Sequence, residues 1–192
     1  HTALRRQRQM CIRDRGDGTG LNQIMVSRIS EGGLDYKLAI DQLPHQGLAL
    51  THSYNEVITD SAAAATSWAT GFKTKNKFLS VTPEKETLET ITEMLTKKGY
   101  TSGLVATSSI THATPAAFYA HIDSRYKEVE IANQLLDSSI DISLGGGLEF
   151  FDLEKAKVSH KLITDKNSLN NNIKSPRKIL GLFDDDGISR SP

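Results

Sequence analysis

The twenty residues from Val57 to Asn76, VITDSAAAATSWATGFKTKN, constrain the fold more than any other stretch. The two β-branched residues at its start favour a strand. Asp60 and Ser61 suit a helix N-cap, the alanines that follow are strong helix formers, and Gly71 suits the end of a helix. The pattern therefore predicts a strand, a tight turn and a helix, with Ser61 at the helix N-terminus.

A serine at that position has two interpretations. Unpaired backbone N–H groups and the positive end of the helix dipole make a helix N-terminus a binding site for anions, phosphate above all, so Ser61 could be a nucleophile aimed at phosphorus. Alternatively, Asp60 and Ser61 are a plain helix cap. This segment by itself leaves both open.

The rest of the chain predicts a parallel α/β sheet. Thr82-Pro83 and Gly99 predict the start and end of a second helix, with an apolar stripe at Leu88, Ile91 and Leu95. Towards the start of the chain, residues 21–29 predict a helix and residues 48–50 predict a short strand. After Gly99, residues 104–106 (Leu-Val-Ala) predict a buried strand. Residues 129–136 then predict an amphipathic helix, and residues 140–144 predict another strand. Alternating strands and helices favour a parallel sheet, whose ligands gather at the carboxyl ends of the strands. We expect Ser61 and the segment from Thr107 to follow two such ends.

The segment TSSITHATPAAFYAHIDSR, residues 107–125, is the second candidate for chemistry. His112 and Thr114 are two residues apart, so in extended backbone their side chains point the same way. Thr114 and Pro115 suit the cap and first turn of a helix, which gives Thr114 a structural alternative. A helix continuing from Thr114 would carry Arg125 about 16 Å along its axis, at about 1.5 Å per residue. The helix therefore either runs past the site or breaks before Arg125.

Four segments together resemble the alkaline phosphatases. TDSAAAATSWATGFKT is similar to the family's nucleophile segment, including Lys73-Thr74, and the THATPAAFYAH stretch, the loop Gly16-Asp17-Gly18-Thr19-Gly20 and the LGGG at residues 144–147 match three others. The resemblance implies the family's α/β sandwich, here incomplete, with a mainly parallel sheet and helices on both faces.

The resemblance also implies roles for individual residues. Ser61 would become phosphorylated, and Arg125 would hold phosphate oxygens, for which a planar guanidinium is suited. Asp17 would bridge the magnesium site and one zinc site, and Thr114 would be a magnesium ligand. His112 lies at a position beside the metal; because Mg²⁺ prefers oxygen ligands, we expect His112 to act next to the metal rather than as a direct ligand. We also expect Asp60 to hold Arg125 in position.

Charge and composition exclude several other classes. Lys+Arg and Asp+Glu balance at 23 each, but residues 1–15 hold five arginines and one acid, which leaves 18 basic against 22 acidic residues in 16–192. This balance does not indicate a nucleic-acid surface. No run is apolar enough to span a membrane, and the one cysteine, Cys11, rules out a disulfide framework.

Residues 1–15 show neither helical nor strand periodicity and lack the apolar core of a signal peptide. They could be a basic arm, but they resemble translated adapter sequence, and we expect them to be non-native or disordered. Residues 16–192 are then the amino-terminal part of one alkaline-phosphatase-like α/β domain.

The predicted function is metal-dependent hydrolysis of phosphate monoesters through a phosphoserine at Ser61. The family implies two Zn²⁺ and one Mg²⁺, a homodimer, and a periplasmic or extracellular location. The chain lacks the family's remaining zinc ligands and the glutamate of its magnesium site, so we expect a fragment with little or no activity alone. Two alternatives stay open: a phosphodiesterase or sulfatase-like hydrolase of the same superfamily, and a non-catalytic anion- or metal-binding module.

Overall fold

The computed structural model describes residues 11–172 and 177–188 of the chain. The fold divides into two compact units, with the division between Ala49 and Leu50. The first unit contains α1 (Leu21–Gly32), the helix expected from the apolar spacing, and the short 3-10 helix η1 (Ala39–Gln42). None of its described residues is buried, so the buried core of the described chain belongs to the second unit.

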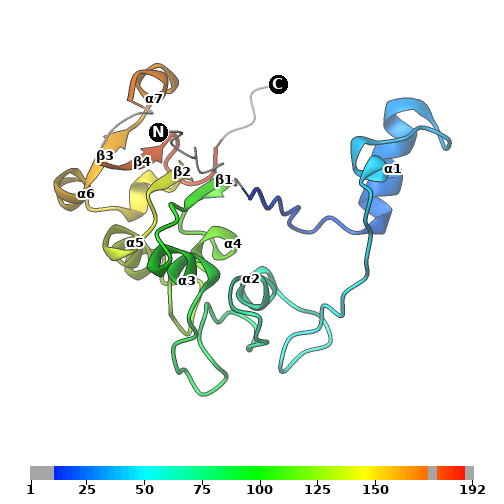
Figure 1. Cartoon of the computed structure of the whole chain (residues 1–192), viewed down its shortest axis with the longest axis horizontal. Coiled ribbons are helices and arrows are strands. Elements are labelled where there is room, and N and C mark those ends of the chain that lie inside the picture. Colours follow the sequence, from blue (N-terminus) through cyan, green and yellow to red (C-terminus); the bar gives the residue numbers. More distant parts are fainter. Residues whose placement is uncertain (1–10, 173–176, 189–192) are drawn as a thin grey trace, which may run out of the picture. The chain divides into compact units, whose positions relative to one another are not determined.

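A four-stranded parallel sheet organises the second unit (Figure 1). Its strands are β1 (Gly103–Ser109), β2 (Ile142–Gly146), β3 (His160–Ile163) and β4 (Lys178–Leu182), in the order β1-β2-β4-β3. Helices α5 (Glu128–Asp137), α6 (Leu153–Ser159) and α7 (Lys166–Asn172) connect them in turn, and η2 (Leu148–Phe150) follows β2. The predicted α/β class with a parallel sheet is confirmed.

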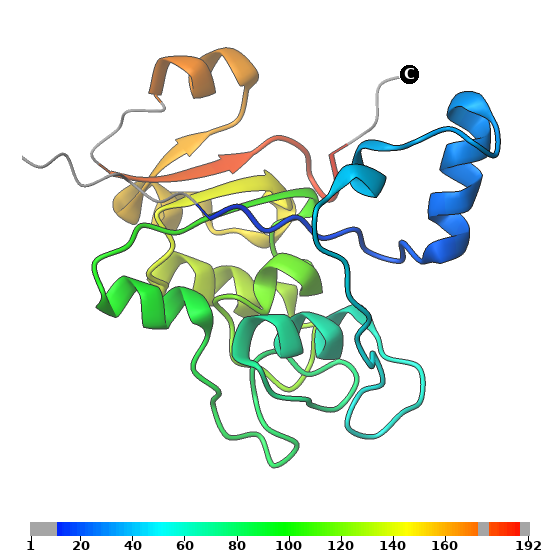
Figure 2. The same ribbon diagram turned by 45° about the vertical axis from the view of Figure 1, so that its right-hand side comes forward.

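Helices lie on both sides of the sheet (Figure 2): α3 (Ile91–Lys97), α4 (Ala113–Ala116) and α5 on one, α7 on the other. The buried stripe of α5 consists of Ile131, Ala132, Leu135 and Leu136. The spacing predicts a stripe of Val129, Ala132, Leu135 and Leu136, but Val129 is 59% exposed and Ile131 is buried in its place. The buried stripe joins the alanines of α4 and Leu180 and Leu182 of β4 in one core. In the described part of the chain, no helix has the length and apolar character needed to cross a membrane.

Strand β1 differs from its prediction. Leu104 and Ala106 pack partly against the core, but Val105 is 78% exposed. One face of β1 is therefore exposed in the described chain, where we expected a strand buried on both faces.

Helix α3 begins eight residues later than predicted, at Ile91, with Thr90 as its cap. Thr82 and Pro83 lie in a tight turn instead, closed by the bridge between Val81 and Thr87. The Thr82 hydroxyl accepts the amides of Glu84 and Glu86, so it caps this turn rather than a helix. The helix ends near Gly99, as expected.

Residues 11–60, the described part of the chain before Ser61, contain no strand, and residues 48–50, predicted as a short strand, are irregular. Val57 and Ile58 are 89% and 82% exposed. β-branched residues favour strands mainly because they pack well on a half-buried sheet, and here no sheet is present to cover them. The prediction that Ser61 follows the end of a strand is therefore wrong.

Glycines at the end of β2 allow close backbone contacts. A Cβ on Gly146 would lie 1.8 Å from the Asp186 carbonyl oxygen, and Gly147 has φ of 99°. The LGGG segment thus ends β2 and lets residues 184–187 pass closely over it.

Candidate active site

Ser61 is the first residue of α2 (Ser61–Thr70), as predicted. Asp60 is the N-cap: its Oδ1 accepts the amide of Ala63 at 2.9 Å. Gly71 ends the helix in the left-handed conformation, with φ of 82°. The serine hydroxyl therefore stands at the end of α2 where the helix dipole favours an anion.

The second oxygen of Asp60 connects this helix end to Arg125. Asp60 Oδ2 accepts the amide of Lys77 at 3.0 Å and lies 3.4 Å from Nη1 of Arg125. The expected contact between Asp60 and Arg125 is present in the structure. One carboxylate thus caps the helix that carries Ser61 and binds the guanidinium.

Arg125 reaches Asp60 because α4 is only four residues long and ends at Ala116. The chain then turns back, and Ile122 forms an antiparallel bridge with Leu79. Beyond that bridge the Arg125 amide donates to the Lys77 carbonyl at 2.8 Å. Of the two alternatives that the sequence left open, the helix breaks before Arg125.

Asp123 stabilises the same segment by binding Lys85 at 2.7 Å and Lys127 at 3.1 Å. The hydrogen bonds from these two ammonium groups lower the pKa of the Asp123 carboxyl to about 2. Asp123 is therefore ionised at neutral pH and links the turn around Lys85 to the residues on either side of Arg125.

His112 contacts Arg125 directly, which the sequence did not predict. Nε2 of His112 lies 2.9 Å from Nη2 of Arg125. A guanidinium can only donate, so Nε2 must be the nitrogen without a proton, and its lone pair accepts this hydrogen bond. We expected His112 to act beside a metal rather than as a direct ligand. The contact with Arg125 is compatible with that role, which stays a prediction.

Thr114 is not the helix cap. His112 is the N-cap of α4, and Thr114 is the second helical residue. The backbone from Ala113 is helical, so the expected extended arrangement of His112 and Thr114 is wrong. The segment also starts later than expected, since β1 continues through Thr107 to Ser109.

Asp17 lies in the first unit, in the turn before α1 where Gly18 has φ of 64°. The structure therefore brings together Asp60, Ser61, His112 and Arg125 within the second unit, with Thr114 two residues beyond His112 in α4. The metal-ligand roles of Asp17 and Thr114 stay predictions.

The donor chemistry of these residues fits magnesium in kind, because carboxylate and hydroxyl oxygens are ligands that Mg²⁺ prefers. A zinc site commonly takes three or more His, Cys, Asp or Glu side chains. In the parts of the chain that the structure describes, no group of three such residues could hold a metal ion. The described residues therefore do not form a zinc site by themselves.

The chain matches the family model for alkaline phosphatase over residues 12–191. Alkaline phosphatase 4 of Bacillus subtilis strain 168 is 36% identical over 197 residues, covering 92% of this chain and 42% of the relative.

Solved structures agree with the sequence comparison. The alkaline phosphatase of the Antarctic bacterium TAB5 superposes with a TM-score of 0.83 at 35% identity, over 90% of this chain and 52% of that one. A mutant of the same enzyme, with Mg bound in its M3 site, superposes with a TM-score of 0.84 at 35% identity and the same coverage. The chain thus spans about half the length of the proteins it matches.

Proposed function

Because this chain belongs to the alkaline phosphatase family, we propose that its complete protein hydrolyses phosphate monoesters through a covalent intermediate on Ser61. The observation that carries the proposal is the position of Ser61 at the N-terminus of α2, beside the Asp60 carboxylate that holds Arg125. A nucleophile, an anion-binding helix end and a fixed guanidinium are the groups that phosphoryl transfer requires.

In the proposed reaction the Ser61 oxygen forms a bond to phosphorus while the bond to the alcohol oxygen breaks, and the alcohol leaves with a proton. Water then attacks the phosphoserine and releases inorganic phosphate. Arg125 neutralises charge on the phosphoryl oxygens in both steps, and Asp60 keeps the guanidinium oriented.

A serine hydroxyl reacts poorly at neutral pH unless its proton is removed or its alkoxide is stabilised. Bound divalent cations would supply that stabilisation, and we propose two Zn²⁺ and one Mg²⁺ in the complete protein. Asp17 and Thr114 would hold metal through their oxygens, with the remaining ligands outside this chain. A homodimer and a periplasmic or extracellular location are further expectations for the complete protein.

The test uses the complete reading frame, expressed with Zn²⁺ and Mg²⁺. We expect hydrolysis of p-nitrophenyl phosphate, and a peptide containing phosphorylated Ser61 by mass spectrometry after acid quenching. Ser61→Ala should abolish both signals. Ser67→Ala is the matched control, since Ser67 lies on the same helix and its hydroxyl donates to the Ala63 carbonyl. Full activity in Ser61→Ala would refute the proposal.

A further inference from the structure

The side chain of Asn76 binds the backbone on both sides of Thr59. Its Oδ1 accepts the Asp60 amide at 3.1 Å, and its Nδ2 donates to the Ile58 carbonyl at 3.0 Å. An amide N–H can only donate and a carbonyl can only accept, so one orientation of the Asn76 amide satisfies both. The Asn76 side chain therefore makes the hydrogen bonds to Ile58 and Asp60 that the backbone of a neighbouring strand would otherwise make.

Neighbouring contacts extend this pairing toward the chain start. The backbone N–H of Asn76 donates to Oδ1 of Asn55 at 3.0 Å, and the backbone N–H of Tyr54 donates to the Thr74 carbonyl at 2.9 Å. Contacts near both ends of the segment from Tyr54 to Asp60 thus join it to Thr74–Lys77, although neither segment is a strand.

Lys77, the residue after Asn76, contacts both Asp60 and Arg125 of the candidate site. The Lys77 amide donates to Asp60, and the Lys77 carbonyl accepts the Arg125 amide. Asn76 and Lys77 therefore connect the segment that carries Ser61 with the segment that carries Arg125.

We propose that Asn76 is a positioning residue for Ser61, and through Lys77 for Arg125; its catalytic meaning rests on the proposed function. Val57 and Ile58 are almost fully exposed, so burial of apolar surface does not hold this segment. On the amino-terminal side of α2, hydrogen bonds to Asn76 therefore hold the backbone that leads to Asp60. Asp60 in turn caps α2 and binds the guanidinium, so a shift of its backbone displaces both groups.

The primary test measures amide hydrogen exchange in the 192-residue chain, which requires no catalysis. In Asn76→Ala the Asp60 amide loses its acceptor, and we expect its exchange to become at least about tenfold faster, as for a hydrogen bond lost from a local structure. The amide of Leu180, which is in the core, should keep its wild-type exchange rate and so report that the fold is intact.

Asn133→Ala is the matched control. Asn133 also donates through Nδ2 to a carbonyl, that of Val129 at 3.0 Å, and accepts through Oδ1 from Lys155 at 3.1 Å, but it lies on α5. This control should leave Asp60 exchange unchanged. If Asn76→Ala does not fold, Asn76→Leu is used instead, because leucine keeps the approximate shape of asparagine and removes both hydrogen-bonding groups.

A second measurement follows the Ser61 and Arg125 amides by NMR while inorganic phosphate is titrated. We expect Asn76→Ala to weaken phosphate binding about tenfold, and Asn133→Ala to leave it unchanged. No response in the wild-type chain would count against the proposed anion site, whereas the exchange result would still decide the role of Asn76. Wild-type exchange at Asp60 in the folded Asn76 variant would overturn the inference.

Discussion

Lys77 combines a left-handed backbone with two hydrogen bonds at the candidate site. Its φ is 76°, a conformation that costs a side-chain-bearing residue about 1 kcal/mol or more relative to glycine. Its amide and carbonyl bind Asp60 and Arg125, and its ammonium group lies 5.9 Å from the centroid of the Tyr126 ring. In this conformation the Lys77 N–H points to Asp60 and the Lys77 carbonyl accepts the Arg125 N–H.

The first prediction compares Lys77→Gly with Lys77→Ala. Both lose the contact with Tyr126, but only alanine keeps the steric cost of positive φ, so we expect the glycine variant to be more stable by about 1 kcal/mol. Urea unfolding measures the difference. At Lys157, inside α6, the order should reverse, because alanine favours a helix by about 1 kcal/mol over glycine. Equal stability of the two Lys77 variants would contradict the strain.

Thr74 carries the second prediction. It is fully buried, and its hydroxyl has no hydrogen-bond partner among the described residues. Because a buried unsatisfied polar group costs about 1–3 kcal/mol, Thr74→Val should raise the free energy of unfolding by about 1 kcal/mol.

The control for Thr74 is Thr66→Val. The equally buried Thr66 hydroxyl donates to the Phe78 carbonyl at 3.2 Å and accepts the Ser80 amide at 2.9 Å. Removing it leaves both groups unpaired, so this variant should lose about 1–3 kcal/mol in the same urea experiment. A loss of stability in Thr74→Val would show that its hydroxyl does have a partner.

Single residues also explain how far the sequence predicts the site. Ser61 at the helix start and the contact between Asp60 and Arg125 follow from capping chemistry and the family resemblance. The contact between His112 and Arg125 could not be predicted, because it depends on where α4 ends and how the chain returns to Leu79. Asn76 offered one signal: asparagine side chains often bind nearby backbone in place of regular structure.

At the scale of elements, the patterns predicted both ends of α2 but only the end of α3. Gly71 and the region of Gly99 end α2 and α3, because glycine adopts the left-handed conformation readily. The start of α3 was misplaced because Thr82-Pro83 suits a turn as well as a helix. The true start is a capping box, in which Thr90 accepts the Glu93 amide while the Glu93 carboxylate accepts the Thr90 amide.

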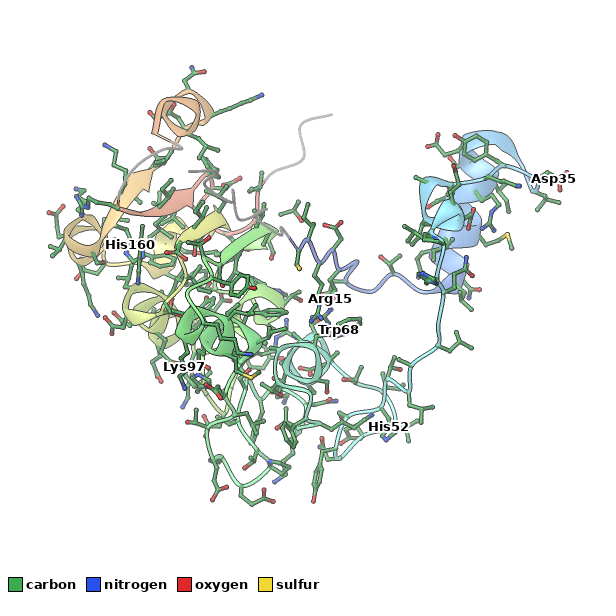
Figure 3. The ribbon with its side chains drawn as sticks, viewed as in Figure 1. Arg15, Asp35, His52, Trp68, Lys97 and His160 are labelled. Carbon is green, nitrogen blue, oxygen red and sulfur yellow. The ribbon has the colours of Figure 1, made fainter. Side chains whose placement is uncertain are left out.

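The pairing of β3 with β4 gives the third prediction. His160, at the start of β3 (Figure 3), is buried and stands opposite Lys178 in the register of the two strands. Burial, and then the charges of Lys178 and Arg177, lower the pKa of His160 to about 4. An unfolded histidine titrates near 6.5, so protonation favours the unfolded chain.

The stabilising effect of neutral His160 is therefore complete above pH 6.5 and is lost as the pH falls from 6.5 toward 4. We expect this residue to account for a loss on the order of 2 kcal/mol between pH 7 and pH 4.5. Urea unfolding of wild type and His160→Gln at both pH values isolates the effect, since the other titrating groups are common to both chains. Parallel pH dependence of the two proteins would contradict it.

At the scale of the whole molecule, the core and the catalytic candidates are separable. The described core lies entirely in the second unit, built from α2, α4, α5 and the sheet. Within that unit Asp60, the cap of α2, contacts the Arg125 guanidinium, whereas no group of three acidic, histidine or cysteine residues in the described chain could hold a metal ion. We therefore expect the second unit to fold without completed metal sites.

The fourth prediction follows: the 192-residue chain folds but turns over little or no substrate alone. Without a full ligand set, the Ser61 hydroxyl keeps its proton at neutral pH, and orientation by Arg125 does not compensate for the missing activation. Cooperative urea unfolding should accompany no measurable hydrolysis of p-nitrophenyl phosphate with Zn²⁺ and Mg²⁺ added. Turnover that Ser61→Ala abolishes and Ser67→Ala preserves would show that the residues of this chain are sufficient for catalysis.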